Sequence, residues 1–234
     1  MNVLITGASR GIGAAAYALL AKTGHKVVGH STKGSDQLIA GDLTDPSAPR
    51  DIWDTALDEL DGTIDVLVNN AGIYEGVPDN ASDQEWHAAW QRTMTINLQA
   101  AADLSRLAVS HFLDRGGGGR IVNVASRAAF RGDSPQHWHY AASKGAIVSM
   151  TRTVARGYAG EGILCFAVAP GFTVSEMTAE YLQGRGGAQI IAEIPLGRVA
   201  STDEVAEVIR WLSIDAPASA TGSIIDVNGA SYVR

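Results

Sequence analysis

Segments with the character of strands alternate with helical segments along almost the whole chain, and this alternation constrains the fold more than any other feature. Short uninterrupted apolar runs predict strands that are buried on both faces. Segments with apolar residues at helical spacing lie between them. The predicted strands cover residues 3–5, 26–30, 37–40, 64–68, 120–125, 163–168 and 223–227. The predicted helices cover residues 11–23, 48–60, 82–112, 138–159 and 202–212.

This order predicts an α/β fold: a doubly wound, Rossmann-like parallel sheet of about seven strands, with helices on both faces. No linker, repeat or low-complexity tract divides the chain, so we expect one domain over residues 1–234. The segment between the second and third strands is too short for a full helix. We expect that crossover to be a loop or a single turn.

Composition and charge exclude several classes of protein. The formal net charge of −7, with no long basic run, argues against nucleic-acid binding. The single cysteine, Cys165, excludes an internal disulfide and a cysteine-rich metal site, and His137 and His139 have no third ligand in view. No apolar run reaches the roughly 18 residues of a membrane span. The first strand begins too early to leave room for a signal peptide, so we expect a cytoplasmic protein without a metal.

A glycine-rich run joins the first predicted strand to the first predicted helix. Thr6–Gly13 has the spacing G-x-x-x-G-x-G. Glycines at such a turn let the backbone approach a pyrophosphate, which then meets the N-terminus of the helix. The run therefore predicts a dinucleotide site, although a plain strand-to-helix turn has the same composition.

The end of the second predicted strand indicates which dinucleotide is bound. An Asp or Glu there usually holds the ribose 2′-hydroxyl of NAD, but Gly29–Lys33 contains no carboxylate. Ser31, Thr32 and Lys33, together with Arg10 of the glycine run, suit the 2′-phosphate of NADP. We predict NADP(H) in preference to NAD(H); the alternative is that Lys33 only points into solvent.

Two further segments lie at strand ends. Asn69–Gly72 follows the fourth predicted strand, where small residues allow close approach of the adenosine side of a nucleotide and Asn amides can fix the loop. A structural turn fits the same residues. Asp42 follows the third strand, where it either accepts a hydrogen bond from the adenine amine or caps the helix that follows.

Tyr140 and Lys144 lie four residues apart on the predicted helix 138–159, so they share one helix face. A nearby ammonium group favours phenolate and lowers the pKa of a tyrosine. A phenol tuned in this way passes a proton to or from an alcohol or carbonyl oxygen. The pair therefore predicts acid–base chemistry, whereas a lone pair of this spacing is usually a surface feature.

The ordered set of motifs resembles the classical short-chain dehydrogenase/reductase family over the whole chain. The glycine run, Asn69–Gly72 and the Tyr140–Lys144 pair match family motifs, as do Pro170–Gly171, Leu196–Arg198 and the segments Thr221–Gly222 and Val227–Gly229. The resemblance implies four catalytic residues, namely Asn97, Ser126, Tyr140 and Lys144. It implies that Ser126 orients the reacting oxygen, that Lys144 binds the nicotinamide ribose and that Asn97 holds a water.

The resemblance and the residues together define a predicted cofactor site. Its residues are Gly7, Ser9, Arg10, Gly11, Ile12, Gly13, Ser31, Thr32, Lys33, Asp42, Leu43, Asn69, Ala71, Gly72, Tyr140, Lys144, Pro170, Gly171, Thr173 and Ser175.

The resemblance implies an NADP(H)-dependent oxidoreductase that interconverts a carbonyl and a secondary alcohol. The overall sequence is similar to β-ketoacyl carrier-protein reductases, so a 3-oxoacyl thioester is one predicted substrate; the alternative is an NAD-dependent dehydrogenase of a small alcohol, sugar or cyclic diol. A non-catalytic nucleotide-sensing regulator is a remote alternative, because the chain keeps all four catalytic residues. Arg127 and Arg131 either attract an acidic partner or are solvated. We expect a substrate lid at about 175–195 and a homotetramer or homodimer.

Overall fold

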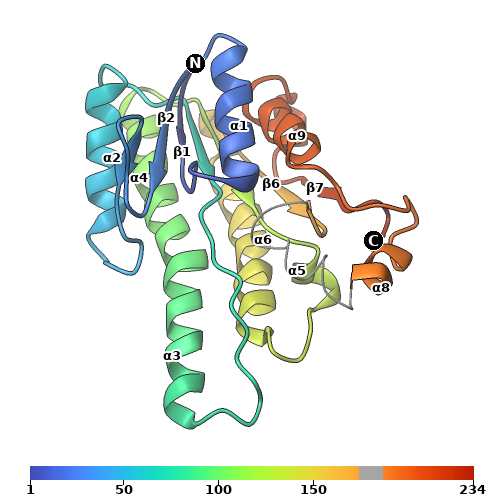
Figure 1. The fold of residues 1–234 in the computed structure, drawn as a ribbon. Helices are drawn as coiled ribbons and strands as arrows, with labels where there is room; N and C mark the ends of the chain where they lie inside the picture. The colour runs from blue at the N-terminus through green and yellow to red at the C-terminus, as the bar shows by residue number, and fades with distance from the viewer. Residues whose placement is uncertain (174–186) are drawn as a thin grey trace.

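A computed structural model describes residues 1–173 and 187–234, and it contains a seven-stranded sheet of parallel strands (Figure 1). The strand order is β3-β2-β1-β4-β5-β6-β7. The strands are β1 (Asn2–Ile5), β2 (Lys26–Ser31), β3 (Leu38–Ala40), β4 (Val66–Asn69), β5 (Gly119–Val124), β6 (Ile163–Pro170) and β7 (Ile224–Val227). The predicted doubly wound parallel sheet is confirmed, with strand ends shifted by one or two residues at most positions.

Helices cover both faces of the sheet. They are α1 (Gly11–Lys22), α2 (Ala48–Glu59), α3 (Asp83–Met94), α4 (Ala100–Asp114), α5 (Ala128–Arg131), α6 (Trp138–Tyr158), α8 (Gly187–Ala192) and α9 (Thr202–Ile214). Short 3-10 turns cover Ala159–Glu161 and Ala218–Ala220. Helices α1 and α9 lie side by side on one face, while α2 and α4 lie on the other (Figure 1).

Alternating side chains of the strands fill apolar cores on the two faces of the sheet, because successive strand residues point to opposite faces. In β1, Val3 and Ile5 pack under α1 and α9. Leu4 packs on the other face, together with Ile52 of α2 and Leu104 of α4. Central strands such as β6 are therefore apolar on both faces, which explains the uninterrupted runs in the sequence.

The connection from β2 to β3 contains no helix, as predicted. The third strand begins at Leu38, one residue later than expected. Its crossover is a tight turn, in which Gly34 has φ +67°. Because the two strands stay parallel and adjacent, the end of β2 remains open beside the glycine loop.

The long helical segment predicted over residues 82–112 is interrupted by a π-helical turn, Thr95–Gln99, between α3 and α4. Helix α3 begins at a capping box: the Ser82 hydroxyl accepts from the Glu85 amide, and the Glu85 carboxylate accepts from the Ser82 amide. π-Helical turns frequently occur at functional sites.

Among the described residues, no helix is both long and apolar enough to cross a membrane.

Candidate active site

The glycine loop lies at the carboxyl end of β1, where the strand order reverses between β1 and β4. Ligands of open α/β sheets bind in the crevice at such a point. Gly7 and Gly11 have φ values of +67° and +58°, in the left-handed region that favours glycine. Helix α1 begins at Gly11, with no acidic residue in its first turn and no side-chain cap. Its N-terminal amides therefore form a site suited to a pyrophosphate.

The loop after β4 holds the glycine loop in place. The Asn70 side-chain amide donates to the Thr6 and Gly7 carbonyls at 2.9 and 3.0 Å. A Cβ placed on Gly13 would lie 2.1 Å from the Gly7 carbonyl oxygen, so only glycine fits there. The close approach of the Gly7 backbone explains why the third position of the motif is glycine. It also leaves the N-terminus of α1 free of side chains.

His30 also fixes the glycine loop, a role that sequence analysis did not identify. The ring lies at the end of β2 and is 2% exposed. Its Nδ1 accepts from the Gly7 amide at 3.4 Å, and Nε2 lies 2.9 Å from the Gly41 carbonyl. Burial lowers the pKa of His30, which favours the neutral ring with its proton on Nε2.

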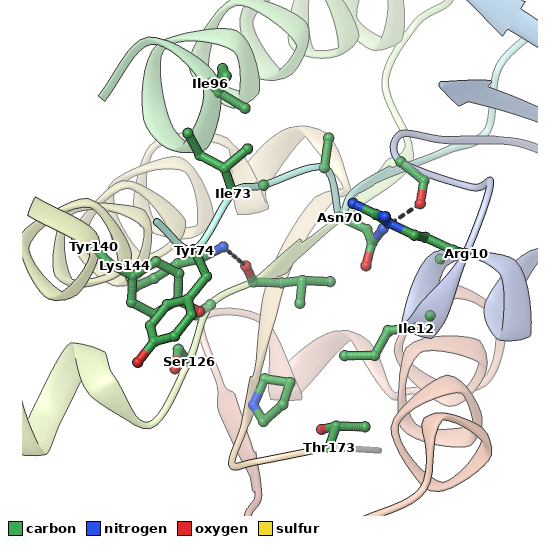
Figure 2. A pocket seen from close by; sticks show the side chains of 18 of the residues that line it. Arg10, Ile12, Asn70, Ile73, Tyr74, Ile96, Ser126, Tyr140, Lys144 and Thr173 are labelled. Atoms are coloured by element: carbon green, nitrogen blue, oxygen red, sulfur yellow. Dashed lines mark hydrogen bonds between the residues drawn. The ribbon is translucent and has the colours of Figure 1, made fainter. Parts of the chain in front are cut away.

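A cavity of about 640 Å³ extends from the glycine loop to Tyr140 (Figure 2). Figure 2 shows Arg10 and Asn70 at one end, with Tyr74, Ser126, Tyr140 and Lys144 gathered at the other. The cavity is lined by most residues of the predicted cofactor site: Gly7, Ser9, Arg10, Gly11, Ile12, Gly13, Ser31, Thr32, Asp42, Leu43, Ala71, Gly72, Tyr140, Lys144, Pro170, Gly171 and Thr173. Its size and its glycine-lined end fit a dinucleotide.

Three predicted cofactor residues are not among the lining residues. Lys33 is exposed beyond the end of β2. Asn69 is buried, and its amide donates to Asn123 and to Ser105 at 2.9 and 3.0 Å. As the last residue of β4 it shares the face of Leu67, so its side chain points under α4 instead of into the cavity. Ser175, like most of the predicted lid, lies outside the described residues.

Asp42 lines the cavity and also caps a turn. Its Oδ1 accepts from the amide and the hydroxyl of Thr44, at 3.0 and 2.8 Å. These hydrogen bonds lower the pKa of the carboxyl group, with the Thr44 amide as the main cause. Helix α2 begins later, so Asp42 caps the preceding turn and not the helix itself. Asp42 also lines the cavity, so its hydrogen bond with the adenine amine stays a prediction.

Tyr140 and Lys144 meet on the buried face of α6. The Lys144 ammonium lies 5.8 Å from the centre of the Tyr140 ring and donates to the Val124 carbonyl at 2.8 Å. Burial raises the pKa of Tyr140 to about 12, and hydrogen bonding with Ser126 lowers it only in part. Burial also lowers the pKa of Lys144 to about 8.

The expectation that Lys144 brings the pKa of Tyr140 toward neutrality is therefore wrong for this structure, because desolvation dominates for both groups. The phenol stays protonated at neutral pH, as a proton donor must be. The neighbouring ammonium is placed to stabilise the phenolate only once the phenolate forms.

Ser126 lies two residues beyond the end of β5 and at the same end of the cavity (Figure 2). Its hydroxyl accepts from the Ala128 amide at 3.1 Å, at the start of the short helix α5, which the sequence did not reveal. That bond occupies only one acceptor site of the hydroxyl, which keeps its own proton to donate. Ser126 is therefore oriented by the backbone, and its hydroxyl also hydrogen-bonds with Tyr140.

Asn97 lies on the π-helical turn and is 2% exposed. Its Oδ1 accepts from the Ile73 amide at 2.8 Å, and its Nδ2 donates to the Ile73 carbonyl at 3.0 Å. Asn97 Oδ1 and Lys144 Nζ lie close to the same point of the backbone, Gly72. A Cβ added to Gly72 would lie 3.3 Å from the first atom and 3.5 Å from the second. The amide thus anchors the cavity wall beside Lys144, and the prediction that Asn97 holds a water stays a prediction.

Tyr74 also lines this end of the cavity, and sequence analysis did not identify it. Its ring stacks on His137 at 3.9 Å, and it meets the Tyr140 ring edge-on at 4.8 Å. Its hydroxyl donates to Asp133 at 3.0 Å. The His137 ring contacts the Ser134 hydroxyl at 2.7 Å, and His139 is fully buried. Both histidines thus serve the packing around α6.

The fold and the site define a dinucleotide-dependent α/β protein with a half-buried tyrosine and a buried lysine at the far end of its nucleotide cavity. A profile of the family described as short chain dehydrogenase matches residues 1–186. The chain is 35% identical over 242 residues to the 3-oxoacyl-[acyl-carrier-protein] reductase FabG of Vibrio cholerae, covering 98% of this chain and 96% of the relative.

Two further comparisons extend this picture. A cis-4-hydroxycyclohexanecarboxylate dehydrogenase of Sinomonas cyclohexanicum is 36% identical, over 97% of this chain and 94% of the relative. A crystal structure of a short chain dehydrogenase from Burkholderia cenocepacia in complex with NADP has a TM-score of 0.88 at 28% identity, covering 98% and 97% of the two chains. The chain belongs to the classical short-chain dehydrogenase/reductase family. It is an oxidoreductase that acts on CH–OH groups and their carbonyl counterparts.

Proposed function

We propose that this oxidoreductase transfers a hydride between NADP(H) and a carbonyl or secondary alcohol, with Asn97, Ser126, Tyr140 and Lys144 as its functional residues. The observation that carries the proposal is one continuous cavity, which joins the N-terminus of α1 to the Tyr140–Lys144 pair. Bound nicotinamide supplies the hydride; the protein supplies geometry and charge.

In carbonyl reduction, Tyr140 donates its proton to the oxygen of the substrate. Ser126 donates a hydrogen bond to the same oxygen and so orients the carbonyl. Lys144 stabilises the phenolate that Tyr140 leaves, and it is charged below a pKa of about 8. Asn97 is a positioning residue, because its amide fixes the Ile73 backbone beside Lys144. In alcohol oxidation the proton moves in the opposite direction.

The end of β2 supports NADP as the preferred cofactor. Ser31 and Thr32 line the cavity together with Arg10 of the glycine loop. No carboxylate lies in Gly29–Lys33 to repel a 2′-phosphate or to bind a 2′-hydroxyl. Replacing Ser31 by Asp should therefore shift the preference toward NAD(H).

The first substrate class to test is a 3-oxoacyl thioester, which the resemblance to 3-oxoacyl-carrier-protein reductases supports. The second is a small cyclic or acyclic alcohol. Its support is the similarly close relative that acts on a hydroxycyclohexanecarboxylate. The two classes differ in what must enter the cavity. A thioester substrate would insert only the end of the carrier protein's prosthetic arm, whereas a small alcohol would enter as a whole molecule.

Assembly as a homotetramer or homodimer, and a cytoplasmic location, stay predictions. An aromatic cluster on α3 and α6 supports assembly. Trp138 is 55% exposed and meets the Trp86 ring edge-on at 5.4 Å. Exposed aromatic side chains of this kind are enriched at protein interfaces. Light scattering coupled to size-exclusion chromatography tests this, and a monomer would contradict it.

The experiment that tests the proposed function is a kinetic panel with purified protein. A 3-oxobutanoyl thioester, cyclic and linear ketones, and aldoses are offered with NADPH and NADH, and turnover is followed by cofactor absorbance. We expect turnover of at least one carbonyl class with a clear NADPH preference. A clear NADH preference rejects the cofactor assignment, and no turnover of any class in either direction rejects the catalytic one.

A further inference from the structure

A buried arginine lines the same cavity as Ser126 and Tyr140. Arg127 follows Ser126 in the chain, is 8% exposed and lines the cavity. Its Nη1 donates to the Ser231 hydroxyl at 2.5 Å, and its guanidinium lies 4.9 Å from the centre of the Phe172 ring. Its backbone amide donates to the Pro170 carbonyl at 2.9 Å, which fixes the residue between β5 and β6.

The charge of Arg127 has no carboxylate partner within the described part of the chain. Burial lowers its pKa, and the nearby cation Arg131 is the next largest influence. The two acidic groups in the vicinity have other partners: Glu193 pairs with Arg131 at 3.4 Å, and Asp133 accepts from Tyr74 at 3.0 Å. Taking a charge out of water is costly unless it is paired. An anionic ligand would supply that pair.

The position of the guanidinium limits which anion can reach it. Arg127 lines the same cavity as Ser126 and Tyr140, so an anion bound to it there would lie within a few bonds of the oxygen that these two hydroxyl groups would contact. The phosphate of a carrier protein's prosthetic arm is separated from its thioester by many more bonds. A carboxylate on a small substrate satisfies both contacts at once, and arginine binds a carboxylate through paired N–H donors.

We propose that Arg127 is a specificity-determining residue that binds a carboxylate of the substrate, so that the enzyme acts on small oxo acids and the matching hydroxy acids. This inference rests on the proposed function and selects the second of its two substrate classes. In reduction, hydride adds to the carbonyl carbon and Tyr140 supplies the proton to its oxygen. The carboxylate stays unchanged and only anchors the molecule.

The test compares a matched pair of substrates, 4-oxocyclohexanecarboxylate and its methyl ester, which differ in charge at one group. We expect kcat/KM for the acid to exceed that for the ester by roughly 10- to 100-fold in the native protein, the range of a hydrogen-bonded charge pair. In Arg127→Gln this ratio should fall to about 1, chiefly through a higher KM for the acid. Arg127→Lys should restore part of the ratio.

A matched control is Arg152→Gln, which removes an exposed arginine on α6 outside the cavity and should leave the ratio at its native value. A purely structural role of Arg127 predicts a different result. In that case Arg127→Gln lowers kcat/KM equally for acid and ester and reduces thermal stability, and the inference is overturned.

Inhibition of the native protein keeps the proposal testable if Arg127→Gln fails to fold. Cyclohexanecarboxylate should compete with the ketone substrate, whereas cyclohexanecarboxamide should compete at least tenfold more weakly. Equal inhibition by the two compounds overturns the inference. Turnover of the ester at the same rate as the acid also overturns the inference about Arg127, but it leaves the proposed hydride transfer intact. No turnover of any carbonyl compound contradicts the proposed function itself.

Discussion

Replacing Lys144 by Met should make the protein more stable at neutral pH while it destroys activity. Burial lowers the pKa of Lys144 from 10.5 to about 8. A group whose charged form is disfavoured in the folded state destabilises the fold below its folded pKa, and this penalty disappears above its unfolded pKa. The difference between 10.5 and about 8 corresponds to about 3 kcal/mol.

The variant lacks this penalty, so its free energy of unfolding at pH 7 should exceed that of the native protein by up to about 3 kcal/mol. The lost hydrogen bond from Lys144 to the Val124 carbonyl offsets part of the gain. As pH rises through 8 toward 10.5, the native lysine loses its proton in the folded state, and the difference should shrink. At pH 9.5 it should be about 1 kcal/mol.

Urea unfolding followed by tryptophan fluorescence measures this difference at each pH. The native protein and Lys144→Met are compared at the same pH, so other titrating groups cancel. Lys33→Met removes an exposed lysine and is the matched control. A variant that is no more stable than the native protein at pH 7, or a gain that is the same at pH 7 and pH 9.5, refutes the claim that burial dominates the electrostatics of this site.

Three other predictions follow from the same geometry. Gly13→Ala should abolish NADPH binding, measured by fluorescence titration, because its Cβ would lie 2.1 Å from the Gly7 carbonyl oxygen; an unchanged Kd contradicts this. Ser201→Ala removes the capping box with Glu204 at the start of α9 and should cost about 1 kcal/mol in urea unfolding, where no loss would argue against the cap. The kcat for carbonyl reduction should fall as pH rises through about 8, because Lys144 then loses the charge that stabilises phenolate; a flat profile up to pH 10 opposes that role.

The sheet and its helices could be predicted because their signals are local. Uninterrupted apolar runs in β1 and β6 mark strands that are covered on both faces, and the Ser82–Glu85 pair marks the start of α3. The π-helical turn Thr95–Gln99 and the short helix α5 were not predicted. Neither has a local periodicity of its own, since each depends on what packs against it.

Site residues that belong to motifs of fixed spacing could be predicted. Those that reach the site only through tertiary contacts could not. His30 and Tyr74 reach the site only because β2 and the segment after β4 end beside it, and nothing near them in sequence marks this. Asn69 was assigned to the cofactor, yet strand alternation turns its side chain toward α4. The pKa of Tyr140 was expected to fall, but the depth of its burial is a property of the folded chain.

The central claim is that Tyr140 transfers the proton at the cofactor cavity. Turnover of Tyr140→Phe, measured together with its affinity for NADPH, tests this most directly. We predict a loss of roughly 10²–10⁴-fold in kcat, with NADPH bound as tightly as by the native protein. Near-native turnover by this variant, with the fold and NADPH binding intact, would contradict the account.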